Sequence, residues 1–193
     1  MVRESAQPAP FTPGMIGFSN NKEGGRIIRF FTRSRISHTF VFTFTLKGIP
    51  AVQEASASVQ IVPFLSRYHG NPSYSYEVYE VTAGSVTEED VESTLSRIFE
   101  EFAGVKYGWL QTLWFPYRWF LEAVLGRRDV HRKKNWFTHG VICSELLFWY
   151  LKYLDPLFST LLKEYDADTI QPGDLLEVVK AHPEYFRLVA SQE

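Results

Sequence analysis

The chain has 193 residues, of which 45% are hydrophobic, 22% are charged and 16% are aromatic, and its formal net charge is −2 at pH 7. This length favours a single domain, and the composition excludes collagen-like, coiled-coil and wholly disordered chains. The near-neutral charge gives no general attraction to nucleic acid, so we expect no nucleic-acid partner. With one cysteine and no H-E-x-x-H motif, the chain offers neither a disulfide framework nor a zinc motif.

The N-terminal sequence and the most hydrophobic stretch bear on where in the cell the protein resides. The N-terminal sequence lacks an apolar signal region, and we expect residues 1–12 to form a loose arm. The most hydrophobic stretch, Tyr107–Gly126, contains Arg118 and Glu122 and is too interrupted to cross a membrane. We therefore expect a protein that is cytoplasmic as synthesised, while delivery to the cell envelope by another route stays open.

Strands are predicted in the first half of the chain, after a short helix at Ile27–Thr32. The clearest is His38–Leu46, in which phenylalanines at every second position alternate with threonine and valine. His38 shares the face of these phenylalanines, and we expect this face to meet the core and to be covered by a helix. Three further strands are expected at Ile49–Ala55, Ser58–Phe64 and Tyr74–Thr82.

Helices are predicted in the second half. Thr87 and Asp90 have the spacing of a capping box, and Gly104 should end the helix that follows. Later segments are a helix at Trp109–Leu125 broken near Pro116, a basic loop at Gly126–Asn135, a helix from Gly140 or Val141 to Leu154, and a turn at Pro172-Gly173-Asp174 before a last short helix. This order predicts an α+β fold with helices packed on one face of an antiparallel sheet.

Cys143 is the first candidate for chemistry. It lies in the first turn of the predicted amphipathic helix, where free backbone N–H groups and the helix dipole favour a thiolate. The same N–H groups can bind an oxyanion. A thiolate nucleophile also needs a base and a group that orients the base. The alternative is that Cys143 is a small buried hydrophobic side chain.

Five histidines could supply the base. His69, His131 and His182 are predicted to be surface residues in loops or beside a proline. His38 opens a strand on a buried face, where its ring needs a polar partner. His139 precedes Cys143 by four residues and is a rival base.

Several short motifs, in this order, resemble the permuted NlpC-type papain-like cysteine hydrolase and amidase superfamily, in its YiiX-like branch. They are Pro13-Gly14-Met15, Ser37-His38, Glu54-Ala55, Val59–Phe64, Tyr107-Gly108, Cys143-Ser144-Glu145-Leu146 and Pro172-Gly173-Asp174-Leu175. Met15 stands where the usual opening motif of that branch has an acidic residue. The resemblance extends from about Pro13 to Leu175 and implies one permuted papain-like domain.

The resemblance also implies the roles of individual residues. Cys143 would be the nucleophile, His38 the base and Glu54 the orienting group. Tyr107 and Ser144 are candidates for oxyanion or substrate binding. The implied enzyme is a thiol peptidase or amidase that needs no cofactor and cleaves an amide bond in cell-wall peptide. The alternatives are an acyl-lipid hydrolase or acyltransferase of the lecithin:retinol acyltransferase type, and a non-catalytic binding module on the same fold.

The assignment of Glu54 as the group that orients His38 depends on the register of the strands. A plain two-residue loop at Lys47-Gly48 would pair Glu54 with Val41 and turn Glu54 away from His38. A wider loop or a bulge would return Glu54 to the face of His38, so this assignment predicts a wider loop. Glu80, in a later strand, is the rival carboxylate.

An aromatic cluster precedes the basic loop. We expect it to pack in the core, and the alternative is a groove or a patch for peripheral membrane contact. The cluster comprises Trp109, Trp114, Phe115, Tyr117, Trp119 and Phe120.

Overall fold

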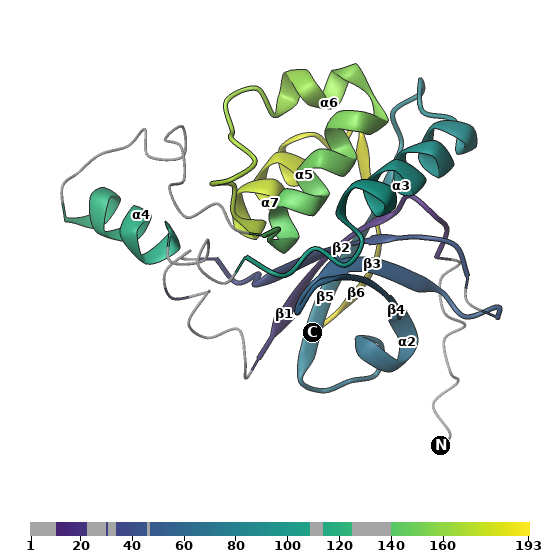
Figure 1. Cartoon of the computed structure of the whole chain (residues 1–193), viewed down its shortest axis with the longest axis horizontal. Coiled ribbons are helices and arrows are strands. Elements are labelled where there is room, and N and C mark those ends of the chain that lie inside the picture. Colours follow the sequence, from purple (N-terminus) through teal and green to yellow (C-terminus); the bar gives the residue numbers. More distant parts are fainter. Residues whose placement is uncertain (1–10, 23–29, 31–33, 46, 109–113, 125–139) are drawn as a thin grey trace.

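The computed structural model describes residues 11–22, 30, 34–45, 47–108, 114–124 and 140–193. The fold is α+β, as predicted, and is built on a six-stranded antiparallel sheet with strand order β4-β3-β2-β1-β5-β6 (Figure 1). The strands are β1 (Ile16–Asn21), β2 (His38–Phe42), β3 (Ala51–Ala55), β4 (Val59–Pro63), β5 (Tyr74–Val81) and β6 (Phe186–Gln192). The helices are α2 (Phe64–Arg67), α3 (Glu88–Phe102), α4 (Trp114–Ala123), α5 (Cys143–Leu154), α6 (Pro156–Leu161) and α7 (Pro172–Ala181).

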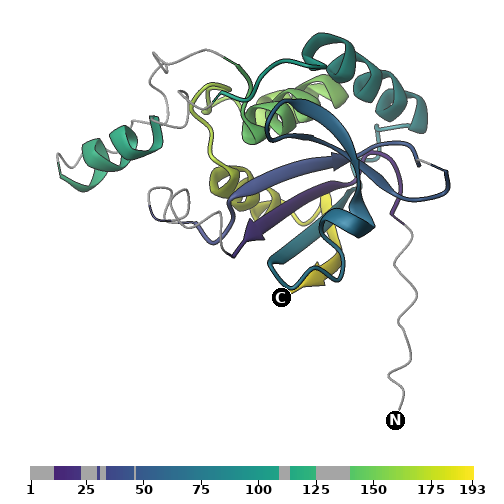
Figure 2. The ribbon, with the colours of Figure 1, turned by 60° about the horizontal axis from the view of Figure 1, so that its bottom comes forward.

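Both faces of the sheet are covered, which differs from the one-sided packing that we expected. Helices α3, α5, α6 and α7 lie on one face, and the short helix α2 lies on the other (Figures 1 and 2). Val41 of β2 joins the core on the α5 side. Phe40 and Phe42 join a second core with Phe64 and Tyr68, at and after α2.

The face of His38 is therefore a core face, but it is not the face on which α5 packs. The phenylalanines that share its parity meet α2, whereas Thr39 donates a hydrogen bond to the Cys143 carbonyl on the α5 side. The expectation that a single helix-covered face would hold both His38 and Cys143 is wrong. A central strand buried on both sides has two apolar faces, so alternation alone does not say which helix covers which face.

The register of the β2–β3 hairpin places Glu54 on the same face as His38. Phe40 of β2 lies opposite Glu54, and Phe42 lies opposite Val52. The strands are joined through residues 43–50, where Lys47 and Gly48 have positive φ angles of 52° and 79°. The connection is thus wider than two residues, as the Glu54 assignment required.

Two strands were not predicted. β1 lies in the middle of the sheet between β2 and β5, and its Ile16 and Phe18 are fully buried. Its alternating residues are glycine and serine, so the segment has few of the residues that mark a strand. β6 is an edge strand with mostly exposed or half-buried residues, where burial imposes little pattern on the sequence. Conversely, β2 ends at Phe42 rather than at Leu46, and Phe44 beyond it is exposed.

The helix features predicted from the sequence are present in the structure, with two corrections. Thr87 and Asp90 form the predicted capping box at the start of α3. Pro116 lies in the first turn of α4, where a missing N–H costs nothing, so it does not break that helix. The predicted turn at residues 172–174 is instead the beginning of α7, with Pro172 at its first position.

Some expectations fall partly or wholly outside the described residues. They concern the helix at Ile27–Thr32, the basic loop at Gly126–Asn135, Leu46, Trp109, His131 and His139. The predicted arm overlaps the ordered fold, because Phe11 is buried and stacks on Phe42 with ring centroids 4.9 Å apart. Across the described ranges, the longest apolar helix falls short of what a membrane span requires.

The aromatic cluster is not uniformly core. Tyr117 and Phe120 on α4 are 49% and 45% exposed. The ring of Trp119 lies 6.1 Å from that of Phe30, and the side chains of Trp114 and Phe115 are outside the described set. On the same helix, Leu121 is buried. The expectation of core packing is therefore wrong for Tyr117 and Phe120.

Candidate active site

Cys143 is the first residue of α5, and a hydrogen bond from β2 holds its backbone in place. Ile142 caps the helix in an extended conformation. Thr39 Oγ1 donates a buried hydrogen bond of 2.7 Å to the Cys143 carbonyl, which ties the start of α5 to β2. The residue after His38 therefore fastens the helix that carries the cysteine.

A close backbone approach brings Tyr107 to the same place. Val141 N–H donates to the Lys106 carbonyl and Gly108 N–H donates to the Val141 carbonyl, each at 3.2 Å. Gly140 has a φ of 114°, and a Cβ there would lie 2.4 Å from the Lys106 carbonyl oxygen. Only glycine permits this approach, and the approach sets Tyr107 beside the helix start.

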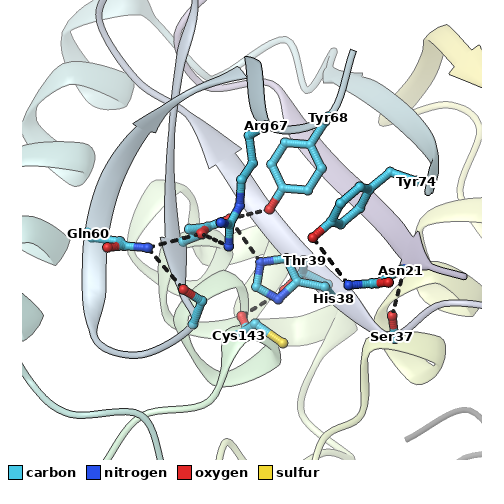
Figure 3. Close-up of polar contacts among 11 residues, drawn as sticks. Asn21, Ser37, His38, Thr39, Gln60, Arg67, Tyr68, Tyr74 and Cys143 are labelled. Carbon is cyan, nitrogen blue, oxygen red and sulfur yellow. Dashed lines mark hydrogen bonds and ion pairs between the residues drawn. The ribbon is translucent and has the colours of Figure 1, made fainter. Parts of the chain in front are cut away.

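His38 connects the cysteine to the sheet. Its Nε2 lies 3.2 Å from Glu54 Oε2, so Nδ1 is the ring nitrogen that remains for the thiol. Figure 3 shows the His38 imidazole between the Cys143 side chain and the side chains of Arg67 and Tyr68. The structure thus brings together the three residues that the resemblance implied, Cys143, His38 and Glu54.

The Glu54 carboxylate is fully buried and accepts hydrogen bonds at both oxygens. Arg67 Nη2 and Gln60 Nε2 donate to Oε1 at 2.9 and 3.3 Å, and the Tyr68 hydroxyl donates to Oε2, which also faces His38. Burial would raise the pKa of this carboxyl group. The hydrogen bond and charge of His38, with Tyr68 and Arg67, outweigh burial and lower the pKa to about 2.

The electrostatics favour a thiolate paired with an imidazolium. Burial opposes protonation of His38, but Cys143 and Glu54, by charge and hydrogen bonding, raise its pKa from 6.5 to about 10. Burial would also raise the pKa of the Cys143 thiol. The charge and hydrogen bond of His38, together with backbone hydrogen bonds from Thr39 and Ser144, lower that pKa below its ordinary value. The two shifts act in the same direction, toward a proton on His38 rather than on Cys143.

Tyr107 and Ser144, the two candidates for oxyanion binding, differ in their contacts. Tyr107 is buried, and burial with the charge and hydrogen bond of Cys143 raises its pKa, so its hydroxyl stays protonated beside the sulfur. The Ser144 hydroxyl is fully buried and donates to the Ile170 carbonyl at 2.7 Å. Ser144 therefore offers its backbone N–H to the site, while its hydroxyl fastens α5 to the segment before α7.

The other polar candidates lie elsewhere. Glu80 pairs with Arg187 of β6 rather than with His38. His69 Nδ1 lies 2.8 Å from the Tyr76 hydroxyl, and His182 pairs with Glu184.

Sequence reasoning missed the residues that surround Glu54, namely Gln60, Arg67 and Tyr68. Arg67 and Tyr68 lie at the end of α2, a helix of four residues. Such a helix is too short to show helical periodicity, so no sequence pattern marked these two residues.

Comparison with known proteins finds a similar fold among solved structures. No protein-family model matches the chain, and no curated protein matches its sequence. A crystal structure of the metalloprotein YiiX from Escherichia coli O157:H7, a DUF1105 protein, matches 94% of this chain and 97% of its own at 18% identity, with a TM-score of 0.50. The chain has a YiiX-like fold. At this identity the likeness concerns the fold alone.

The description of YiiX as a metalloprotein raises the question of a metal site here. Within the ranges that the structure describes, no group of three or more His, Cys, Asp or Glu side chains is arranged to hold a metal ion. Cys143, His38 and Glu54 instead form a chain of hydrogen-bond partners in which Glu54 is surrounded by donors from Gln60, Arg67 and Tyr68. These three side chains are thus arranged as hydrogen-bond partners and not as a set of metal ligands.

The shifted pKa values predict how Cys143 reacts with iodoacetamide as pH changes. An ordinary thiol of pKa about 8.5 becomes roughly 200-fold more reactive between pH 6 and pH 9, because its thiolate fraction rises by that factor. The lowered pKa of Cys143 and the raised pKa of His38 predict a ratio clearly smaller than that of an ordinary thiol. The ratio is measured within one protein and is independent of how easily the reagent reaches the sulfur.

Two controls sharpen this experiment. His38→Ala should return the ratio to that of an ordinary thiol, because the imidazolium that stabilises the thiolate is lost. His182→Ala removes a histidine that pairs with Glu184 and should leave the ratio unchanged. A wild-type ratio near 200 would contradict the ion pair.

Proposed function

We propose that the protein is a cysteine hydrolase on a permuted papain-like core. The observation that carries the proposal is the position of His38, which joins the thiol of Cys143 to the buried carboxylate of Glu54. A helix-start cysteine, a strand histidine and an orienting carboxylate are the parts that nucleophilic thiol catalysis needs.

The first half of the reaction uses the ion pair. The Cys143 thiolate attacks the substrate carbonyl carbon, and the carbonyl electron pair moves to oxygen. In this proposal the backbone N–H of Cys143 and the Tyr107 hydroxyl donate hydrogen bonds to the oxyanion. When the tetrahedral adduct collapses, the carbon–nitrogen bond breaks, and the His38 imidazolium gives its proton to the leaving amine.

The second half regenerates the enzyme. Neutral His38 takes a proton from water, and the hydroxide attacks the thioester carbonyl of the acyl-enzyme. The carbon–sulfur bond then breaks, the carboxylic acid leaves, and the sulfur departs as a thiolate again paired with protonated His38. Glu54 stays ionised throughout and stabilises the imidazolium each time it forms.

For the substrate, we propose an amide bond of cell-wall peptide, which makes the protein a peptidoglycan endopeptidase or amidase. The support is the resemblance of its motifs, from Ser37-His38 to Cys143-Ser144-Glu145-Leu146, to the NlpC-type hydrolases. The same proposal requires that the protein reach the cell envelope.

An acyl-lipid hydrolase or acyltransferase is the second candidate, and an observation on α4 favours it. Tyr117 and Phe120 are about half exposed, and Val124, just beyond the helix, is 57% exposed. Exposed apolar side chains grouped on one helix are a feature of surfaces that meet lipid.

One experiment compares the two substrate classes. Purified peptidoglycan and vesicles of phosphatidylcholine with phosphatidylglycerol are each incubated with the wild type and with Cys143→Ala, and products are identified by mass spectrometry. We expect new amine and carboxyl termini in the peptide arm, absent with Cys143→Ala. Fatty acid or lysolipid in the lipid arm alone would favour the second candidate. Cleavage in neither arm would remove the support for both substrate classes.

A further inference from the structure

The carboxylate of Glu54 has a second set of partners that the proposed mechanism does not use. Two consecutive residues at the end of α2 each take one of its oxygens. Arg67 Nη2 lies 2.9 Å from Oε1, and the Tyr68 hydroxyl donates to Oε2, the oxygen that also faces His38 (Figure 3). Gln60 of β4 adds a third contact to Oε1 at 3.3 Å.

Tyr68 is itself held rigidly. Its side chain is 1% exposed, and its ring stacks on Phe40 with centroids 4.6 Å apart at an interplanar angle of 25°. The edge of the Tyr74 ring packs against it at 5.2 Å. Because aromatic packing fixes the ring, the hydroxyl has one position. From there it donates to the carboxylate oxygen of Glu54 that also faces His38.

Arg67 contributes charge as well as a hydrogen bond. Its guanidinium is the only cation besides the His38 imidazolium that contacts Glu54 among the residues that the structure describes. The titratable and charged groups around the site come from five parts of the fold. They are His38 on β2, Arg67 and Tyr68 at the end of α2, Tyr74 on β5, Tyr107 before α4, and Cys143 on α5.

We propose that Arg67 and Tyr68 are positioning residues, which hold the Glu54 carboxylate in the orientation that keeps His38 paired with the Cys143 thiolate. The proposal rests on the proposed function only in taking Cys143 as the reactive thiol. A carboxylate held by one donor can rotate about its side-chain torsions, whereas one held at both oxygens from α2 cannot.

The proposal predicts the direction of a pH effect. Without the Tyr68 hydroxyl, Oε2 of Glu54 is held by His38 alone, so the carboxylate turns more readily and stabilises the imidazolium less. The thiolate is then less stabilised by the imidazolium. The pKa of the Cys143 thiol must then rise toward its ordinary value, since the lowering depends first on His38. The rate of Cys143 alkylation falls on the acid side of its pH profile as the thiolate is protonated, and we call this part of the profile the acid limb. The acid limb should accordingly move to higher pH.

The main test is Tyr68→Phe, with Tyr76→Phe as the matched control. Tyr76 belongs to the same aromatic core, is 4% exposed and uses its hydroxyl on His69 rather than on Glu54. In Tyr68→Phe we expect the acid limb of iodoacetamide alkylation to rise by about half to one pH unit, and any hydrolysis rate to fall about ten- to a hundredfold. Tyr76→Phe should leave both unchanged, which a merely structural role for the tyrosine hydroxyls would not predict.

A second pair of variants keeps the proposal testable if Tyr68→Phe folds poorly. The Arg67 side chain is 39% exposed, so its replacement perturbs the core less. Arg67→Met should raise the acid limb in the same direction, because it removes a cation and one hold on Glu54. Arg67→Lys keeps the charge and one donor and should recover most of the wild-type profile.

The outcomes separate this inference from the proposed function. Alkylation needs no substrate, so a shifted limb in Tyr68→Phe and Arg67→Met supports the inference even if neither peptidoglycan nor lipid is cleaved. If the wild type cleaves substrate and both variants keep the wild-type limb and rate, the inference is overturned and the hydrolase proposal stands. Equal shifts in Tyr68→Phe and Tyr76→Phe would also overturn it.

Discussion

Replacing Cys143 with alanine is expected to abolish turnover while the fold remains intact. The sulfur is the nucleophile of the proposed reaction, and the chain has one cysteine. The substitution removes one buried heavy atom, which costs on the order of 1 kcal/mol in the free energy of unfolding. It also removes a buried charge, which offsets part of that cost. Steady-state hydrolysis and thermal unfolding of the same preparation measure the two effects.

The matched control is the neighbouring residue. Ser144→Ala removes a hydroxyl that is fully buried and bonded to the Ile170 carbonyl, so it should lower stability by about 1 kcal/mol and leave much of the turnover. The two variants should therefore differ in turnover, with Cys143→Ala inactive and Ser144→Ala active, while their losses of stability are similar. Full activity in Cys143→Ala would end the thiol mechanism and make Ser144 the next nucleophile to examine.

The three residues that the structure brings together were expected from short motifs and from the resemblance of those motifs to the NlpC-type hydrolases. Cys143 stands at the start of a helix whose apolar stripe is visible in the sequence, and His38 opens a strand whose alternation is plain there. The hairpin between β2 and β3 then leaves only the loop width to decide whether Glu54 shares the face of His38. The structure has the wider connection, with Phe40 opposite Glu54.

The surroundings of the site could not be predicted in the same way. The hydrogen bonds that Arg67 and Tyr68 donate to Glu54 depend on α2, whose four residues follow β4 without a helical pattern. The face of the sheet on which α5 packs could also not be predicted from the sequence, because β2 presents apolar side chains to two cores. His38 meets Cys143 at the start of β2, where the strand begins beside the N-terminus of α5, and not across a shared apolar face. Such end-to-end placement is a tertiary property that strand parity does not encode.

The second large effect is expected from Glu54. Glu54→Gln keeps the shape of the side chain but removes the negative charge that stabilises the His38 imidazolium, and one of its polar atoms becomes a donor facing other donors. We expect the rate of hydrolysis to fall about a hundredfold, since hydrogen bonds to charged groups contribute roughly 1.5 to 3 kcal/mol. Glu54→Ala leaves Arg67 and Tyr68 without their acceptor, and should destabilise the fold by about 3 to 5 kcal/mol.

The effect on stability has a defined pH dependence. The pKa of Glu54 is lowered from 4.5 to about 2 in the folded protein. A group whose pKa is depressed by folding contributes its stabilisation in full above the unfolded pKa and loses it as pH falls toward the folded pKa. The difference in unfolding free energy between the wild type and Glu54→Gln should therefore be largest above pH 4.5 and shrink between pH 4.5 and 2. Urea unfolding at a series of pH values measures this difference.

Glu80→Gln is the control that distinguishes the two carboxylates. Glu80 pairs with Arg187, whose side chain is 68% exposed, and exposed ion pairs contribute between about 0 and 1 kcal/mol. The control variant should therefore keep the wild-type rate, the wild-type alkylation profile and nearly the wild-type stability at every pH. Because Glu54 and Glu80 both lie in strands and differ in what surrounds them, a loss of rate in Glu80→Gln with none in Glu54→Gln would reverse the assignment. That result would leave Cys143 and His38 as a pair whose histidine is oriented by another group.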